Sequence, residues 1–469
     1  MFKHVGNYLL SNVATKALGI ISIPIYTYML NPEDYGMISL YIAYSSIAAV
    51  LLTTNSHTSI SRYFFEEKED FKVFVGNSLI ISIISTLILG FLGILFLYYF
   101  IVDLTLPNWT FGLIILATLS SIFSSIFMQI HLPQNNSALI AKTTIIAGYG
   151  QFIINILTVC LSPSPKWIFL IFAKLFGAIL LNFIFFKHIK EFIECRLNFL
   201  HFKYIFNYSL PLIPYVLGST LLAQIDRIMI SGSSNVAETG MYSLAVSLAF
   251  LVPIVGFSID QAWIPSYFKF MKDKNYIRHD QECKTNLIYW SLTAAGFILF
   301  FLEPTKILIQ KEFHHALILI PIIILGYLFE FYFRIYGKNI GYVKKTVYSS
   351  IIYLSAGIIN VFLNYYTLKK FGYQVAAINT VLSFICLFIF AWFVSKHILK
   401  THTLPIVHLF PSFLTVIGSC FVFYINKFVV MDNFIYIAFK YMTFAIILFI
   451  FYRDFTWNFF ETYLKRKTI

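Results

Sequence analysis

The chain has 469 residues, of which 59% are hydrophobic, 19% are aromatic and only 12% are charged. A soluble fold could not bury so much apolar surface beneath a solvated shell, so these proportions exclude a cytosolic enzyme and also a disordered chain. A polytopic membrane protein remains. The net charge of +13 is scattered between apolar runs, a pattern typical of membrane orientation and not of a nucleic-acid-binding surface.

Motifs for covalent chemistry are missing from the sequence. The five cysteines are widely spaced and form no CxxC pair, so neither a disulfide framework nor a metal site is predicted. The chain also lacks a Walker A motif and the Gly-x-Ser-x-Gly and His-Glu-x-x-His motifs. We therefore expect no catalytic residue, no cofactor and no direct coupling to ATP.

Fourteen apolar stretches are long enough to cross a membrane, which takes about 20 residues each. The sequence thus predicts an all-α polytopic membrane protein with about 14 transmembrane helices. The predicted spans are 5–30, 37–60, 73–101, 110–132, 138–161, 167–186, 207–231, 239–265, 286–303, 314–337, 346–367, 373–395, 403–425 and 433–452.

The distribution of positive charge predicts the orientation of these spans. With the N-terminus in the cytoplasm, 23 Lys and Arg residues fall on the cytoplasmic side and 6 fall on the outer side. Cytoplasmic loops carry such an excess. Both termini are therefore expected in the cytoplasm.

An internal repeat relates the two halves of the chain. Shifted by 204 positions, residues 34–40 align with residues 238–244 with four identities. An even number of helices per repeat gives both copies the same topology, as in parallel repeats around an axis along the membrane normal. The expected organisation is two six-helix lobes, 1–200 and 201–400, with a substrate cavity between them, followed by helices 13 and 14 and a basic tail in 401–469.

Several cations lie inside or at the ends of the predicted spans: Lys16, Arg62, Lys142, Lys174 and Arg227. An ionisable group in a span costs about 2.5–3.5 kcal/mol, so each is a candidate functional residue. The first lobe has no intramembrane acid, and a cavity with that lining prefers an anion such as phosphate or pyrophosphate. The alternative is that these side chains reach to the interface or make packing hydrogen bonds.

Four further charged residues are candidates for gating or ion coupling. Asp226 and Arg227 are adjacent and point about 100° apart on a helix, so either a gate or a helix-end ion pair is possible. Asp260 either forms a local hydrogen bond or carries a coupling ion. Glu330 and Arg334 are spaced for a same-face ion pair.

Three groups of motifs resemble the bacterial polysaccharide flippases of the Wzx type, which belong to the multidrug/oligosaccharidyl-lipid/polysaccharide exporter superfamily. The resemblance covers most of the chain, with two departures: Gln374-Val375, where many relatives have Gly, and Asn55-Ser56, where relatives often have Leu-Gly. The matching segments are 7–19, 28–36 and 59–64, then 209–214, 226–230 and 240–244, then 344–346, 360–364 and 371–377.

The resemblance implies alternating access around a cationic cavity, and by motif position it carries Lys16, Arg62, Asp226 and Arg227 over as functional residues. The implied cargo is an undecaprenyl-pyrophosphate-linked oligosaccharide for a surface polysaccharide such as an O-antigen, moved across the bacterial inner membrane. Membrane lipids, a polysaccharide polymerase and a chain-length regulator are the candidate partners. Three alternatives stay open: an ion-coupled multidrug exporter, a membrane glycosyltransferase or polymerase, and a scaffold for other assembly enzymes.

Overall fold

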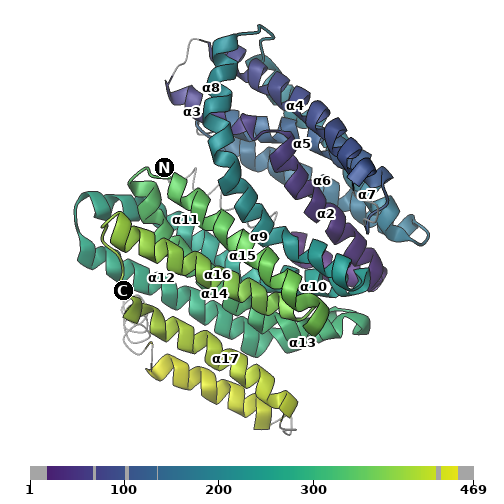
Figure 1. The fold of residues 1–469 in the computed structure, drawn as a ribbon. Helices are drawn as coiled ribbons and strands as arrows, with labels where there is room; N and C mark the ends of the chain where they lie inside the picture. Colours follow the sequence, from purple (N-terminus) through teal and green to yellow (C-terminus); the bar gives the residue numbers. More distant parts are fainter. Residues whose placement is uncertain are drawn as a thin grey trace, which may run out of the picture. The chain divides into compact units, whose positions relative to one another are not determined.

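The computed structural model describes residues 18–66, 70–100, 105–134, 136–428, 435–450 and 452. Within these residues every regular element is a helix and there is no strand (Figure 1). Twelve helices are long and apolar enough to cross a membrane, and two shorter apolar helices lie at Leu18–Met29 and Ile435–Ile450. The predicted all-α polytopic membrane protein of about 14 helices is confirmed.

The remaining helices follow one another in a simple order, interrupted by short 3-10 and π turns. They are α2 (Pro32–Leu52), η1 (Ser56–Thr58), α3 (Ser59–Glu66), α4 (Phe71–Phe100), α5 (Trp109–His131), α6 (Ser137–Leu161), α7 (Lys166–Ile189), η2 (Lys190–Phe192), α8 (Phe199–Ser209), η3 (Leu210–Leu212), α9 (Ile213–Ser233), α10 (Val236–Ala249), α11 (Leu251–Lys272), α12 (Tyr276–Gly296), η4 (Phe297–Phe301), α13 (Leu302–Leu308), η5 (Lys311–Leu319), α14 (Ile320–Tyr342), α15 (Val347–Phe371), α16 (Val375–Phe393), η6 (Val394–Ile398), η7 (Ile406–Leu409) and α17 (Phe410–Phe428).

The second predicted span, 37–60, differs from the helix that forms there. α2 begins at Pro32, which suits a first helical position because its missing N–H needs no partner there. The helix ends at Leu52, because Thr54 and Asn55 adopt left-handed backbone conformations with φ of 49° and 54°. Asn tolerates this region better than most residues. The departure at Asn55 therefore coincides with a break before the separate helix α3.

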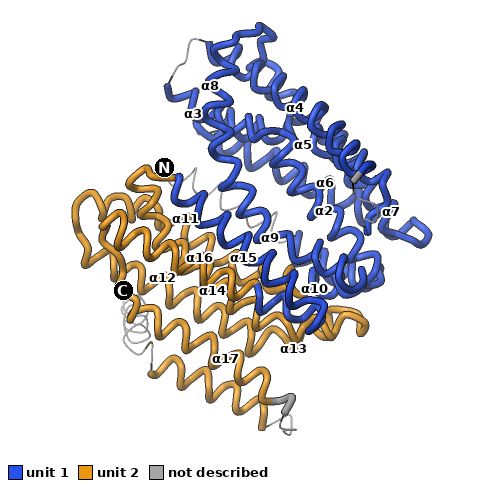
Figure 2. Tube along the Cα trace, viewed as in Figure 1, with its two compact units in different colours: residues 1–244, 347–379 blue, residues 245–346, 380–469 orange. Residues whose placement is uncertain are grey.

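The chain forms two compact units (Figure 2). Unit 1 contains residues 1–244 and 347–379, and unit 2 contains residues 245–346 and 380–469. In unit 1, α2, α5, α6 and α7 pack together, and α9 packs along both α2 and α15. Unit 1 thus joins α9 and α15, from the predicted second lobe, to helices of the predicted first lobe. The division into two lobes and a C-terminal part stays a prediction.

The repeat has a counterpart in how α2 and α10 begin, within unit 1. Asn31 caps α2 by accepting a hydrogen bond from Asp34 N at 2.7 Å, and Asn235 accepts from Glu238 N at 2.8 Å at the start of α10. An N-cap side chain satisfies a backbone N–H that has no partner within the helix. The two caps are separated by the same 204 positions as the aligned segments.

Glycines at equivalent positions let the first turns of these two helices touch. A Cβ placed on Gly36 would lie 2.0 Å from the carbonyl oxygen of Val236, and a Cβ on Gly240 would lie 2.0 Å from that of Pro32. Val236 and Pro32 are themselves 204 positions apart. The crossing is therefore reciprocal: each repeat presents a backbone carbonyl to the glycine of the other, at a distance that no side chain would permit.

In unit 2, α14 is the central helix. In the most apolar stretch of Lys311–Tyr342, 67% of the residues are buried inside the protein. Two of its tyrosines fix neighbouring chain segments: Tyr332 donates to Leu409 O at 3.1 Å, and Tyr336 donates to Leu404 O at 2.9 Å. Peripheral helices instead leave large apolar side chains exposed, which suits contact with lipid.

Candidate functional site

Asp226 is buried in α9, where two neighbouring helices hold it through neutral side chains. Its Oδ2 accepts a hydrogen bond from Tyr242 Oη at 2.5 Å, and its Oδ1 accepts one from Asn364 Nδ2 at 2.6 Å. Asn364 Oδ1 accepts in turn from Asn379 Nδ2 at 2.8 Å. Hydrogen bonds to an ionised acceptor are stronger than neutral ones. This network therefore ties α9, α10, α15 and α16 together within unit 1.

Arg227 follows Asp226 in sequence but lies in different surroundings. The residue is half-buried, and its guanidinium donates to its own helix, to Ala223 O at 2.5 Å and to Gln224 Oε1 at 2.8 Å. Within the described part of the chain, no carboxylate lies within ion-pair distance of Arg227. The described residues thus leave this charge without an opposite charge, and the guanidinium can bind an anionic ligand.

Lys174 is a second uncompensated cation in unit 1. It is half-buried in α7, and the described residues place no carboxylate within ion-pair distance of it. Amide groups lie beside it: Gln151 of α6 donates to Ala173 O at 3.3 Å and to Asn155 Oδ1 at 2.9 Å. Gln151 also occupies the space beside Gly177, one turn further along α7. Lys174 thus lies in a polar part of the α6–α7 contact.

The other predicted cations of this half lie elsewhere. Lys142 is exposed on α6. Arg62 is exposed on α3, pairs with Glu66 at 2.6 Å, and lies 5.1 Å from the ring centre of Tyr208. Tyr204 donates to Glu66 Oε2 at 2.6 Å, and the hydrogen bonds from Tyr204 and Arg62 lower the pKa of the Glu66 carboxyl. Lys16 lies outside the described residues.

Unit 2 contains two of the predicted acids, and each has a cationic partner. Asp260 of α11 forms an ion pair with Lys338 of α14, whose ammonium lies 4.6 Å from the ring centre of Trp263. Glu330 pairs with Arg334 at 2.7 Å, as the spacing predicts. The sequence could not have paired Asp260 with Lys338, because 78 positions separate them and Lys338 follows the end of the predicted span 314–337.

The two units differ in how their charged residues are compensated: the acids of unit 2 discussed above have cationic partners, whereas two cations of unit 1 have no acidic partner among the described residues. A third acid of unit 2, Glu303, pairs with the buried Lys440 at 2.6 Å. Asp226 is satisfied by hydrogen bonds, whereas Lys174 and Arg227 have no acidic partner in the described parts of the chain. Because an uncompensated ion in a membrane span is costly, such residues are usually functional. The arrangement can bind a negatively charged group.

Comparison with known proteins gives matches of sequence and of fold. The family described as polysaccharide biosynthesis protein matches residues 1–271. A protein of the Lsg locus of Haemophilus influenzae (strain ATCC 51907 / DSM 11121 / KW20 / Rd) is 24% identical over 391 residues, covering 76% of this chain and 90% of its own length. A membrane protein of the same strain is 22% identical over 282 residues, covering 58% of this chain and 66% of its own length.

Two solved structures share the fold over most of the chain. The lipid II flippase MurJ, in an inward closed conformation, has a TM-score of 0.72 at 16% identity and covers 97% of this chain and 100% of its own. An inward-facing multidrug resistance transporter of the MATE family has a TM-score of 0.64 at 12% identity, covering 82% and 94%. Together with the sequence matches, these likenesses confirm the resemblance to the exporter superfamily.

Proposed function

We propose that this chain, which belongs to the polysaccharide biosynthesis protein family, is a flippase that moves a lipid-linked oligosaccharide across the bacterial inner membrane by alternating access. The proposed cargo is an undecaprenyl-pyrophosphate-linked repeat unit of a surface polysaccharide. The cargo enters from the cytoplasmic leaflet and leaves into the outer leaflet. In this proposal both termini of the protein lie in the cytoplasm.

The observation that carries this proposal is the charge balance of the membrane helices. Among the residues that the structure describes, Lys174 and Arg227 have no acidic partner, whereas Asp260 and Glu330 are already ion-paired. A diphosphate entering the cavity would supply the missing negative charge. Guanidinium and ammonium groups bind phosphate oxygens strongly where water is scarce. In this proposal the pyrophosphate is held by protein cations and the polyprenyl tail stays in lipid.

Other charged residues are proposed to contact the cargo or to position the cations that bind it. Lys16, Arg62 and Lys142 are further cations that the diphosphate meets along its path. Asp226 has a positioning role, because its hydrogen bonds to Tyr242 and Asn364 fix the turn of α9 that carries the neighbouring guanidinium.

Two ion pairs are proposed to change during transport. Asp260–Lys338 joins α11 to α14, and Glu330–Arg334 lies along α14. A pair with limited access to water is costly to separate unless a new partner replaces the old one. These pairs are therefore suited to gating, or to coupling with an ion that substitutes for one partner.

The reciprocal crossing of α2 and α10 supports alternating access between the two proposed lobes, 1–200 and 201–400. In the predicted topology the first turns of both helices lie on the outer side. The carbonyls of Pro32 and Val236 rest against Gly240 and Gly36, so the two repeats touch backbone to backbone at this end. We propose that this crossing closes the outer exit and that the two helices separate when the cargo leaves.

A complementation experiment tests the function. Cells that lack the gene and have lost the surface polysaccharide receive the wild-type chain, Lys174→Gln, Arg227→Gln or the double variant, with membrane expression measured in parallel. The proposal predicts a large loss of polysaccharide in the double variant. The matched control is Lys369→Gln, which removes an exposed lysine at the end of α15. Wild-type polysaccharide levels in the double variant would reject the proposed role of these cations.

The multidrug exporter of the same superfamily is the nearest alternative. A cation-binding exporter needs an acid that is free to bind its cargo or a coupling ion, but Asp260 and Glu330 are occupied by cations and Asp226 by hydrogen bonds. A glycosyltransferase or polymerase would lengthen or transfer the saccharide, whereas a flippase returns it unchanged. Measuring the chain length of the product in reconstituted vesicles separates these two classes.

A further inference from the structure

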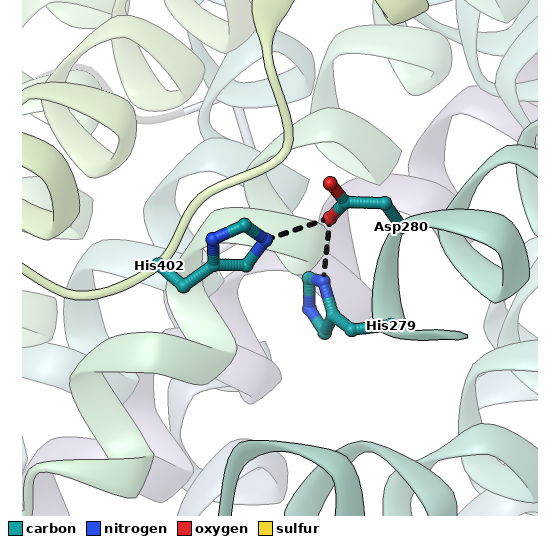
Figure 3. Close-up of side chains that lie close together, drawn as sticks. All are labelled: His279, Asp280 and His402. Carbon is teal, nitrogen blue, oxygen red and sulfur yellow. Dashed lines mark hydrogen bonds and ion pairs between the residues drawn. The ribbon is translucent and has the colours of Figure 1, made fainter. Parts of the chain in front are cut away.

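Three side chains with metal-ligating atoms meet in unit 2 (Figure 3). His279 and Asp280 lie in the first turns of α12, and His402 comes from the segment 399–405 that connects η6 to η7. Asp280 Oδ1 lies 2.9 Å from His279 Nδ1 and 2.9 Å from His402 Nε2. One ligand atom from each of the three residues lies within 4.8 Å of the other two.

The protein holds His402 in place through its backbone and its ring. Asn339 of α14 donates to His402 O at 3.1 Å, and Tyr336 donates to Leu404 O at 2.9 Å. Tyr276 of α12 stacks on the imidazole, with ring centres 4.2 Å apart and planes at 18°. The position of His402 is therefore fixed independently of its contact with Asp280, as is usual for the outer groups that orient a metal ligand.

The distances suit a shared metal ion as well as they suit hydrogen bonds. Zn²⁺ binds imidazole nitrogen at about 2.0–2.1 Å and carboxylate oxygen at about 2.0–2.2 Å. An oxygen and a nitrogen on one such ion are then about 3.0 Å apart at an octahedral angle and about 3.4 Å apart at a tetrahedral angle. The two nitrogen–oxygen distances of 2.9 Å are up to about 0.5 Å shorter than these separations, so an ion could bind if the side chains moved apart by that amount.

Accessibility and charge are also compatible with an ion. The His279 side chain is 2% exposed, whereas Asp280 and His402 are 23% and 24% exposed, so the cluster has one side open for entry and for a water ligand. The nearby cation Lys338 is already paired with Asp260. Its charge therefore opposes the binding of a cation less than an unpaired lysine would.

We propose that His279, Asp280 and His402 form a binding site for a divalent transition-metal ion of the Zn²⁺ class. Two imidazole nitrogens and one carboxylate oxygen are the ligand set that such ions prefer. The bound ion fastens the segment 399–405 to α12, and thereby fixes the connection that leads from η6 into α17. This site shares no residue with the proposed cargo path, so it stands or falls independently of the flippase proposal.

Metal titration of the purified full-length chain tests the proposal. The protein is prepared without a polyhistidine tag, stripped with a chelator and titrated with Co²⁺, whose visible absorption reports coordination, and then with Zn²⁺ as competitor. We expect saturable binding of one Co²⁺ per chain, displacement by Zn²⁺, and an affinity at least about tenfold lower in His402→Gln. The matched control is His397→Gln, an exposed histidine on η6, which should bind as the wild type does.

A second variant separates metal ligation from hydrogen bonding. Asp280→Asn keeps an acceptor oxygen for one imidazole N–H but loses the negative charge. The proposal predicts weaker Co²⁺ binding, with a metal-free Tm close to that of the wild type. Absence of saturable binding to the wild type, or equal affinities in His402→Gln and His397→Gln, would overturn the proposal and leave a hydrogen-bonded cluster only.

Discussion

Substituting Gly240 with alanine should push α2 and α10 apart where they cross. The new Cβ would lie 2.0 Å from Pro32 O, whereas contacts of this kind are seen only beyond about 3 Å, so the helices must separate by about 1 Å. Overpacking of this kind costs about 1–3 kcal/mol. If the crossing forms only in the outer-closed state, the population of that state relative to the open one falls about 5- to 150-fold.

Distance measurements between spin labels can detect this shift. Labels at Glu33 and Ala237, which occupy equivalent positions in the two repeats, are introduced after the five native cysteines are replaced. Double electron–electron resonance should give a distance distribution shifted to longer values in Gly240→Ala, and further still when Gly36→Ala is added.

The control for this experiment is Gly232→Ala, near the end of α9. A Cβ there meets nothing within 4 Å, so the substitution tests the effect of a helix glycine without a steric clash. Wild-type distances in both Gly240→Ala and Gly232→Ala, with both proteins folded, would contradict the predicted separation of α2 and α10.

Three further predictions follow from the same contacts. Asp226→Ala removes the acceptor of two hydrogen bonds and should destabilise the protein by about 1–3 kcal/mol, measured by thermal unfolding in detergent, with Asp226→Asn losing less. Lys338→Ala leaves Asp260 without its cation and should cost about 3–5 kcal/mol, largely restored when Asp260→Asn is added; equal stability of the single and double variants would contradict this. The fold lowers the pKa of the Glu66 carboxyl below its ordinary value of 4.5. The ionised carboxylate therefore stabilises the folded protein at pH values above 4.5, and this contribution is lost as the pH falls through the lowered pKa. The Tm difference between wild type and Glu66→Gln should therefore be present at pH 7 and should vanish in strong acid.

Features that depend on local sequence were predicted well. Apolar runs of membrane length predict helices because a backbone in lipid must satisfy its own hydrogen bonds, and helices occupy these runs. The Glu330–Arg334 pair followed from its spacing along one helix. The early end of α2 was harder to predict, because it depends on the backbone conformation of Thr54 and Asn55 and not on hydropathy.

Features that depend on contacts between distant segments could not be predicted. Asp260 is neutralised by Lys338, 78 positions away. His402 lies beside Asp280 although 122 positions separate them, which is why the spacing of histidines and acids suggested no metal site. The repeat placed Gly36 opposite Gly240 in the alignment, but only the folded chain brings each one against a carbonyl of the other repeat.

The most direct test of the proposed function is a flipping assay in vesicles. The purified chain is reconstituted with a fluorescent polyprenyl-pyrophosphate-linked oligosaccharide, and the rate at which the head group becomes accessible to an external quencher is followed. The flippase proposal predicts a higher rate than in protein-free vesicles, unchanged product length, and a rate close to background in the Lys174→Gln/Arg227→Gln double variant. A wild-type rate equal to that of protein-free vesicles would contradict the proposal.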